Sequence, residues 1–372
     1  MLERFENYLD TAIQRGEVAS RAGIPAARRL MDAAGALRSG ALRLQASDAA
    51  VAGGLAFLIA ELEKRDPTVH EPLTSVTWMR DIPVDSGGGW VEFSSNYFAD
   101  YQISGGNGYG IQAGESTAIP VAQANITKDI YRVFNWFNEA RVTFVDMQKS
   151  QNIGRSLDNL YDNCLRLNWN KSLDQQTYIG PIASAGSTPS YPGLVNNSNV
   201  TASAVATVSA ATTWAAKLAL GTQAGIQAIM NDVNTAVLAT WAASNYDVTG
   251  MANQILIPPA QFTLIANALV STAGTVSILT YILANNIAKT QGVNLKIFPS
   301  RWCSGAGQSA TDRMVAYVAD KKKIYMDIPV PIQRVMTVPT VTGGGAYETL
   351  YGGQIGVVKP MYYQPIAYYD GI

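Results

Sequence analysis

The chain has 372 residues and a formal net charge of −1, with 48 % hydrophobic and only 15 % charged residues. Ordinary soluble domains are about 25 % charged. We therefore expect partners to cover much of the outside, because interface cores are depleted in charge. The neutral balance excludes a basic field that would grip nucleic acid. A monomer with an amide-rich surface is the alternative, and composition leaves it open.

Cysteine content and hydropathy exclude two further classes. The two cysteines, Cys164 and Cys303, form no CxxC pair and imply no disulfide framework. The longest apolar run, residues 51–60, is about half as long as a membrane span requires. We expect a soluble protein of a reducing compartment, without a membrane partner.

The N-terminal part, residues 1–70, is predicted to form a helical arm. It carries nine basic and nine acidic side chains, so it is not a cationic arm. Residues 71–87 follow, and the run Val76–Met79 within them predicts a short strand.

An extended β-hairpin is predicted over residues 88–127. No lysine or arginine occurs in the 47 residues between Arg80 and Lys128. The first arm, Trp90–Phe98, is rich in strand formers, and the glycine-rich run Gly105–Gly110 predicts the turn. A two-stranded ribbon is only marginally stable alone, and its free edges favour pairing with other chains. The hairpin therefore points to assembly.

The clearest helix is predicted from about residue 156 to residue 178, and Gly180–Pro181 is expected to end it. Apolar residues at helical spacing predict one buried stripe, and Cys164 is expected to be a small core residue on it. A second set widens the apolar side. The stripe consists of Ile153, Leu157, Leu160, Cys164 and Leu167, and the widening set of Tyr161, Leu165, Trp169 and Leu173.

Residues 196–320 are predicted to alternate helices and strands, and residues 321–372 to form mainly strands. The fold class is therefore α+β. The main expectations are a helix containing Ile226–Trp241, a strand at Gln254–Ile257, a helix opened by Pro258–Pro259, a helix over Val276–Ile287, and strands at Leu295–Phe298, Met314–Val318, Ile324–Ile328 and Arg334–Val338.

No pattern in the sequence predicts catalysis, a metal site or a cofactor. His70 is the only histidine, and neither cysteine stands at metal-ligand spacing. The glycines at 105–110 have no Gly-Lys-Ser/Thr after them, as a phosphate loop would. The carboxylate pairs Asp81/Asp85 and Asp158/Asp162 are the residues that a glycosidase reading would use. The second pair lies one helical turn apart, which is typical of a solvated face.

Taken in order, these elements resemble the major capsid proteins of tailed bacteriophages with the Hong Kong 97-type fold. The segments that match are Trp90–Phe93 to Ile126 for the extended loop, Ile130–Phe137 entering a peripheral domain, Leu157–Lys171 with Gln176–Gly180 for a long spine helix, Gly193–Asn196 opening an axial α/β domain, Ile255–Phe262 for its strand-Pro-helix step, and Tyr368–Ile372 at the end. The resemblance covers roughly residues 70 to 372.

The resemblance implies domain boundaries. Residues 1–70 would be the N-terminal arm, 71–87 a peripheral-domain strand, and 88–127 the extended loop. Residues 128–195 would form the peripheral domain with its spine helix, 196–320 the axial domain, and 321–372 the return strands to both.

The resemblance also implies self-assembly into pentamers and hexamers of an icosahedral shell in the virion, built in the bacterial host cytoplasm. Portal, scaffolding and decoration proteins would be partners, and double-stranded DNA would be enclosed without sequence-specific binding. Some family members cross-link a loop lysine to an asparagine of a neighbour. The predicted loop here has no lysine, so we expect non-covalent locking.

The residues expected to contact the next copy are Trp90, Phe93, Tyr97, Phe98 and Tyr109. Two alternatives remain. An encapsulin-type bacterial compartment would have the same fold with cargo enzymes inside. A hydrolytic enzyme would be a monomer or a small oligomer.

Overall fold

The computed structural model describes residues 72, 74–104, 119–153, 157–181, 190–271, 274–341 and 345–372. All of these except Pro72 belong to one compact unit, Thr74–Ile372. The predicted N-terminal arm, His70 and Tyr109 lie outside the described residues.

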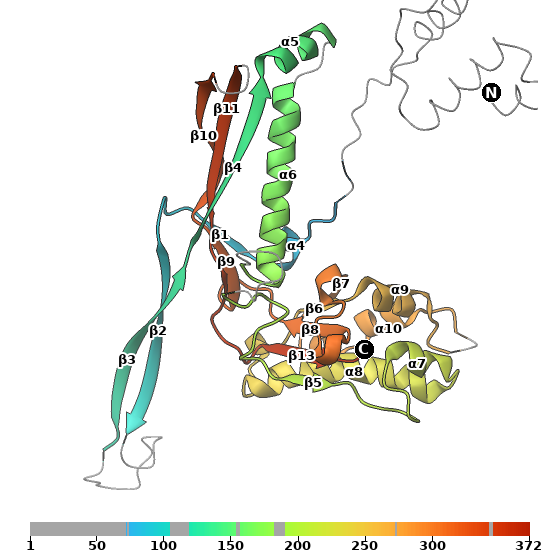
Figure 1. Ribbon diagram of the computed structural model, residues 1–372. Coiled ribbons are helices and arrows are strands. Elements are labelled where there is room, and N and C mark those ends of the chain that lie inside the picture. The colour runs from blue at the N-terminus through green and yellow to red at the C-terminus, as the bar shows by residue number, and fades with distance from the viewer. Residues whose placement is uncertain are drawn as a thin grey trace, which may run out of the picture. The chain divides into compact units, whose positions relative to one another are not determined.

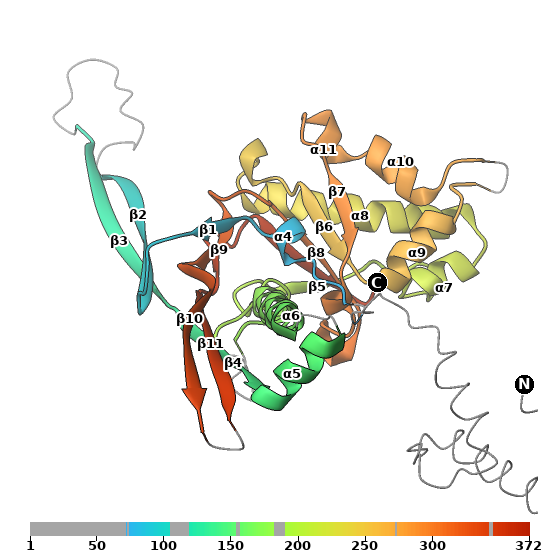
Figure 2. The same cartoon turned by 90° about the horizontal axis from the view of Figure 1, so that it is seen from above.

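A mixed five-stranded sheet forms the centre of the C-terminal half (Figures 1 and 2). Its helices begin where the sequence supplies caps. Thr213 and Thr222 accept hydrogen bonds from backbone amides in the first turns of the helices that begin at Trp214 and Gln223. Pro259 opens a third helix. The strands, in spatial order, are β5 (Ala202–Ala204), β13 (Ile366–Asp370), β8 (Arg313–Tyr317), β6 (Gln254–Ile257) and β7 (Lys296–Pro299). The helices are α7 (Trp214–Ala219), α8 (Gln223–Ala243), α9 (Pro259–Asn267), α10 (Ile278–Ala284) and α11 (Ile287–Thr290).

Both faces of this sheet are covered, so its central strands β13, β8 and β6 are buried almost throughout. Ile255 and Ile257 belong to the cluster beneath α8, α9 and α10. Leu256 between them points the other way, into a second cluster that contains Leu173 and Tyr178. Successive side chains of β6 thus pack alternately into two hydrophobic clusters, one on each face of the sheet.

The long helix α6 (Leu157–Tyr178) lies along an antiparallel sheet of β10 (Val330–Thr340), β11 (Ala346–Ile355) and β4 (Phe134–Thr143) (Figure 1). Trp169 of α6 packs edge-on against Trp136 of β4, with ring centroids 5.1 Å apart. A Cβ atom on Gly353 would lie 2.7 Å from the Trp169 ring, so this close approach requires glycine. The helix ends at Tyr178, and Gly180 two residues later, with a φ of +101°, stops it from continuing.

Two smaller sheets complete the unit. Strands β1 (Val84–Ser86), β9 (Ile324–Ile328) and β12 (Val358–Pro360) form one of them. Strands β2 (Phe93–Ser104) and β3 (Val121–Arg132) pair only with each other, as the predicted hairpin, and extend away from the five-stranded sheet in both views (Figures 1 and 2).

The structure corrects several predictions about individual elements. Val76–Met79 is not a strand, because Trp78–Asp81 forms the short helix α4, and Asp174 of α6 accepts hydrogen bonds from the backbone N–H groups of Thr77 and Trp78 at 2.9 and 3.2 Å. That acceptor is far away in the sequence. The hairpin begins at Phe93 rather than Trp90 and ends at Arg132.

Further corrections concern helices. After β4, Phe144–Ile153 forms a helix, α5, that was not predicted. Val276–Ile287 is not one helix, because α10 ends at Ala284 and Asn286 caps α11 with its side chain. Cys164 is exposed and is not a core residue. The buried side of α6 is the set with Leu165, Trp169 and Leu173, because only that side meets the β4 sheet.

Candidate assembly surfaces

The register of the hairpin separates its side chains into two faces. Residues directly opposite each other in an antiparallel pair point to the same side, and successive residues alternate. We call the side with Tyr101 the apolar face. It carries Phe93, Tyr97, Ala99, Tyr101 and Ile103 of β2 with Ala122, Ala124, Ile126 and Ile130 of β3. The opposite side, the polar face, carries Ser94, Asn96, Asp100 and Gln102 with Gln123, Asn125, Thr127 and Asp129, and it also includes Phe98, Val121 and Tyr131.

The apolar face is open in the single chain. Tyr97, Tyr101 and Ile126 are 68 %, 79 % and 75 % exposed. Isolated surface hydrophobics need no explanation, but a continuous exposed apolar stripe marks an interaction site. The hairpin therefore presents one exposed face that carries most of its apolar side chains.

The polar face is held to the same chain at the base of the hairpin. The Ser94 hydroxyl donates to Asp327 of β9 at 2.5 Å and accepts from the ammonium group of Lys359 of β12 at 2.5 Å. Lys359 is fully buried, bonds to Asp327 and lies 5.4 Å from the centre of the Tyr131 ring. Burial raises the pKa of Tyr131 to about 12, so its hydroxyl stays neutral. Because these contacts hold the polar face, the apolar face is turned to the outside.

Two more contacts fix the entry to the hairpin. The Gln354 side chain accepts from the Val91 amide at 3.0 Å and donates to the Val91 carbonyl at 2.9 Å. Tyr325 donates to the Asn96 side chain at 2.7 Å. The hairpin thus leaves the β9–β12 and β4–β11 sheets in a defined direction.

The structure divides the five predicted contact residues. Phe93 and Tyr97 are exposed on the apolar face. Trp90 stacks on Phe137 of its own chain at 5.9 Å, and Phe98 lies edge-on to Tyr362 at 6.4 Å. Tyr109 lies outside the described residues. Two of the five therefore have aromatic partners within the chain.

Sequence reasoning missed the outer part of the apolar face, at Tyr101, Ile103 and Ile130. The signal was present as partial alternation of apolar and polar residues in both arms. The predicted hairpin also stopped at residue 127. Because β3 continues to Arg132, the hairpin includes Lys128, whose ammonium group lies 5.7 Å from the centre of the Tyr97 ring.

Elsewhere, buried charges are paired within the chain. Lys217 and Asp232 form an ion pair at 2.5 Å, and the Trp214 indole donates to the same carboxylate at 2.9 Å. Arg313 and Asp370 are joined by two bonds of 2.6 and 2.9 Å. Burial alone would raise the pKa of Asp370, but its bonds from Arg313 and the Gln308 amide outweigh this and lower the pKa. These groups are structural.

The carboxylate pairs of the glycosidase reading do not form a site. Asp81 is fully buried and bonded to Arg80, Tyr178 and Gln254. Asp85 is exposed and pairs with Lys321 at 2.8 Å. Asp162 pairs with Arg166 at 2.8 Å across one turn of α6. Asp158 lies 3.8 Å from the guanidinium group of Arg334. Each carboxylate thus has a separate structural partner.

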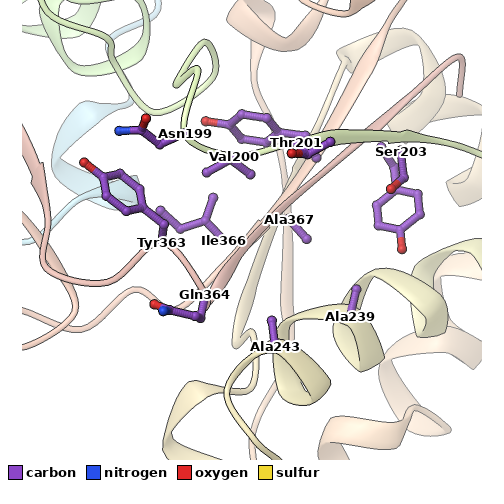
Figure 3. Close-up of a pocket in the computed structure, with 12 residues that line it drawn as sticks. Asn199, Val200, Thr201, Ser203, Ala239, Ala243, Tyr363, Gln364, Ile366 and Ala367 are labelled. Atoms are coloured by element: carbon purple, nitrogen blue, oxygen red, sulfur yellow. The ribbon is translucent and has the colours of Figure 1, made fainter.

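A cleft beside the edge strand β5 has a volume of about 330 Å³ (Figure 3). Thr201, Ser203, Ala239 and Gln364 are among its lining residues, and none of the twelve is charged. Within the described ranges, no group of three or more His, Cys, Asp or Glu residues is arranged to hold a metal ion. In that same part of the chain, no helix combines the length and hydropathy of a membrane span.

Comparison with protein families identifies the family of this chain. Residues 108–372, well over half of the chain, match the family model described as major capsid protein. The chain belongs to the major capsid protein family. This family is not an enzyme family, and its members are structural proteins of a shell. A search of curated proteins finds no match.

Solved structures support the fold. The capsid of Myoviridae Phage XM1 is similar with a TM-score of 0.66 at 16 % identity, over 84 % of this chain and 98 % of that chain. The Microbacterium phage Oxtober96 structure gives 0.55 at 12 % identity, over 85 % and 98 %. The capsid of a native GTA particle gives 0.53 at 10 % identity, over 88 % and 99 %.

The predicted capsid fold of the Hong Kong 97 type is therefore confirmed. The chain is a structural capsid protein that self-assembles into a shell, and its place is the virion. The encapsulin alternative is not favoured, because the family match and these structures belong to capsid proteins.

Proposed function

We propose that each copy of this major capsid protein binds the next through the apolar face of its hairpin, without covalent cross-links. The copies would meet head to tail around five-fold and six-fold axes, in heterologous contacts that close into pentamers and hexamers. Trp90, Phe93, Tyr97, Phe98 and Tyr109 would lie at or beside this contact.

The observation that carries the proposal is the exposed apolar face of the hairpin. A two-stranded ribbon gains little stability alone, and this one leaves the aromatic rings of Phe93, Tyr97 and Tyr101 in water. Burial of apolar area is worth about 25 cal/mol per Å². A neighbour that covers this face therefore gains binding energy that the single chain does not use.

The remaining parts of the chain would have the roles that the resemblance implies. Residues 1–70 would be an arm, 71–87 and 128–195 the peripheral domain with α6, and 88–127 the extended loop. Residues 196–320 would be the axial domain around the symmetry axes, and 321–372 the return strands. The continuous core between α6 and the five-stranded sheet supports peripheral and axial domains that move as one body.

The shell would enclose double-stranded DNA without reading its sequence, because the net charge of −1 supplies no attraction to phosphate. Assembly would take place in the cytoplasm of the bacterial host, with portal, scaffolding and decoration proteins as partners. The protein would have no enzymatic activity. The separately paired carboxylates and the uncharged cleft support this.

Two experiments test the proposal: a measurement of particle size and a deletion of the hairpin. The purified full chain should form particles of megadalton mass by light scattering and shells by electron microscopy. Deleting residues 88–126 should leave subunits that unfold cooperatively and form no shells. As a control, Gln102→Ala on the polar face should assemble normally. Unaltered shells from the deleted chain would refute the role of the hairpin.

A further inference from the structure

Lys359 of β12 lies at the base of the hairpin and is fully buried. Its ammonium group bonds to the Asp327 carboxylate and, at 2.5 Å, to the Ser94 hydroxyl. The rings of Tyr131 and Tyr325 have their centres 5.4 and 5.3 Å from the same ammonium group, a distance at which a cation and an aromatic ring attract each other. Burial of an unpaired charge is strongly unfavourable. The buried charge of Lys359 therefore depends on these four partners.

Two of the four partners belong to the hairpin, one on each arm. Ser94 of β2 stands directly opposite Tyr131 of β3 in the register, so both side chains point to the polar face. The other two partners, Tyr325 and Asp327, belong to β9. One buried cation therefore connects both arms of the hairpin to β9 and β12.

The hairpin divides into two parts by its contacts with the rest of the chain. We call Phe93–Phe98 with Thr127–Arg132 the base, and Ala99–Ser104 with Val121–Ile126 the outer part. Among the described residues, no hydrogen bond, ion pair or ring contact joins the outer part to another element, and it extends away from the other elements in both views (Figures 1 and 2). The direction of the outer part is therefore set at the base.

A small rotation at the base would displace the outer part by a large distance. Ser104 lies ten residues beyond Ser94 on β2, and that length of strand spans about 33 Å. A rotation of about 10° at Ser94 would therefore move Ser104 by about 6 Å. Side chains are in contact only within about 4 Å, so the direction of the hairpin decides whether its apolar face meets a neighbour.

We infer that Lys359 is a positioning residue for assembly: its buried charge holds both arms of the hairpin and sets the direction in which the outer part leaves the subunit. This inference rests on the proposed function, in which the hairpin binds the next copy. Lys359 itself is fully buried and takes no part in that contact. Its effect on assembly is therefore indirect, through Ser94 and Tyr131.

Lys217 provides a comparison within the same chain. It is also fully buried and also pairs with an aspartate, Asp232, at 2.5 Å. The hydrogen bonds described for this pair involve Trp214 and Ala206, and none is with the hairpin. Removal of either lysine should lower the stability of the subunit, but only removal of Lys359 should release the direction of the hairpin.

Distances between spin labels in unassembled subunits test this role. In a Cys164→Ser background, which removes the exposed native thiol, labels at Gln102→Cys on the outer part and Thr235→Cys on α8 should give one narrow distance distribution. Lys359→Met should widen this distribution about twofold or more, because methionine replaces the lysine stem without its charge. Lys217→Met is the matched control and should leave the width unchanged.

A second variant leaves the ion pair of Lys359 and Asp327 in place. Ser94→Ala with Tyr131→Leu removes only the two hairpin groups from the ammonium, so it should widen the distribution even where Lys359→Met fails to fold. An unchanged width in this double variant, or in folded Lys359→Met subunits, would overturn the inference. Equal widening in Lys217→Met would overturn it as well.

Assembly is measured separately. Lys359→Met subunits should give at least tenfold fewer closed shells than wild type by electron microscopy, and Lys217→Met subunits should assemble like wild type under conditions in which both are folded. Shells of wild-type number and size from Lys359→Met would overturn the inference. A wild-type chain that forms no particles would instead count against the proposed function, because the distances in subunits do not depend on assembly.

Discussion

Strands β6 and β2 differ in how far their apolar side chains are buried within the single chain. All four residues of β6 are buried, because helices cover one side of its sheet and the α6 cluster covers the other. On β2, Phe93 and Tyr97 stay exposed, whereas Ser94, Asn96 and Phe98 on the other face contact side chains elsewhere in the chain.

This difference in burial indicates that the five-stranded sheet stabilises the subunit, whereas the hairpin stabilises the proposed contact between subunits. The five-stranded sheet has its core, its caps and its ion pairs within one chain, so it folds without a neighbour. The hairpin is anchored at its base within the chain, and we propose that its apolar face is buried by assembly. Substitutions in the first region should therefore change unfolding, and substitutions on the apolar face should change assembly.

The largest effect on unfolding is expected from Lys217→Met. Asp232 would keep its bond from Trp214 but lose its buried cation. Breaking a buried pair by removing one partner costs about 3–5 kcal/mol. Urea unfolding of subunits measures this cost. The double variant Lys217→Met/Asp232→Asn should recover most of it, and a loss below about 1 kcal/mol for the single variant would contradict the comparison.

A smaller cost is expected at the anchor, from Ser94→Ala. The Ser94 hydroxyl bonds to two charged groups, Asp327 and Lys359, and hydrogen bonds to charged groups contribute about 1.5–3 kcal/mol. The free energy of unfolding should fall by that amount. Ser95→Ala, one residue along on the other face, is the matched control and should stay within about 0.5 kcal/mol of wild type.

Acid should weaken the ion pair between β8 and β13. The pKa of Asp370 is lowered in the folded chain, so its stabilising contribution is fully present above the unfolded pKa, near 4, and is lost as the pH falls through the folded pKa. One proton bounds the slope at about 1.4 kcal/mol per pH unit. Unfolding measured between pH 7 and pH 2.5 should show this loss. Asp370→Asn should be less stable at pH 7 and have a flatter acid dependence.

The smallest effect on unfolding is expected from Tyr101→Ser. The ring is 79 % exposed, so the free energy of subunit unfolding should change by no more than about 0.5 kcal/mol. Assembly should suffer, with particles dissociating at lower denaturant concentration by light scattering. Gln102→Ser should change neither quantity. A Tyr101→Ser subunit that unfolds much more easily would show that the apolar face supports the fold itself.

Much of the fold could be predicted from local signals. The strand Gln254–Ile257, the helix opened by Pro259 and the end of α6 at Gly180 each depend on residues within one or two turns. The hairpin was predicted from its strand formers and glycines, and β2 and β3 confirm it. Its ends were placed less well, because pairing continues through Lys128 to Arg132 and begins only at Phe93.

Predictions failed where a distant partner decides the structure. α4 replaces a predicted strand because Asp174 caps its N-terminus from α6. The stacking of Trp90 on Phe137 of the same chain was not predicted either, and the contact of Trp90 with a neighbour stays a prediction. Neither partner has a signature in the local sequence.

The sequence by itself determined the order of elements, the low charge and the alternation that gives the hairpin an apolar face, because these depend on composition and on the period of each strand or helix. Only the tertiary structure decided which side of each helix or strand is buried. Both sides of α6 carry apolar residues, and packing on β4 buries Trp169 while Cys164 stays outside. Likewise, the bonds of Ser94 to buried Lys359 and Asp327 turn the polar face of the hairpin inward and leave Tyr101 for a neighbour.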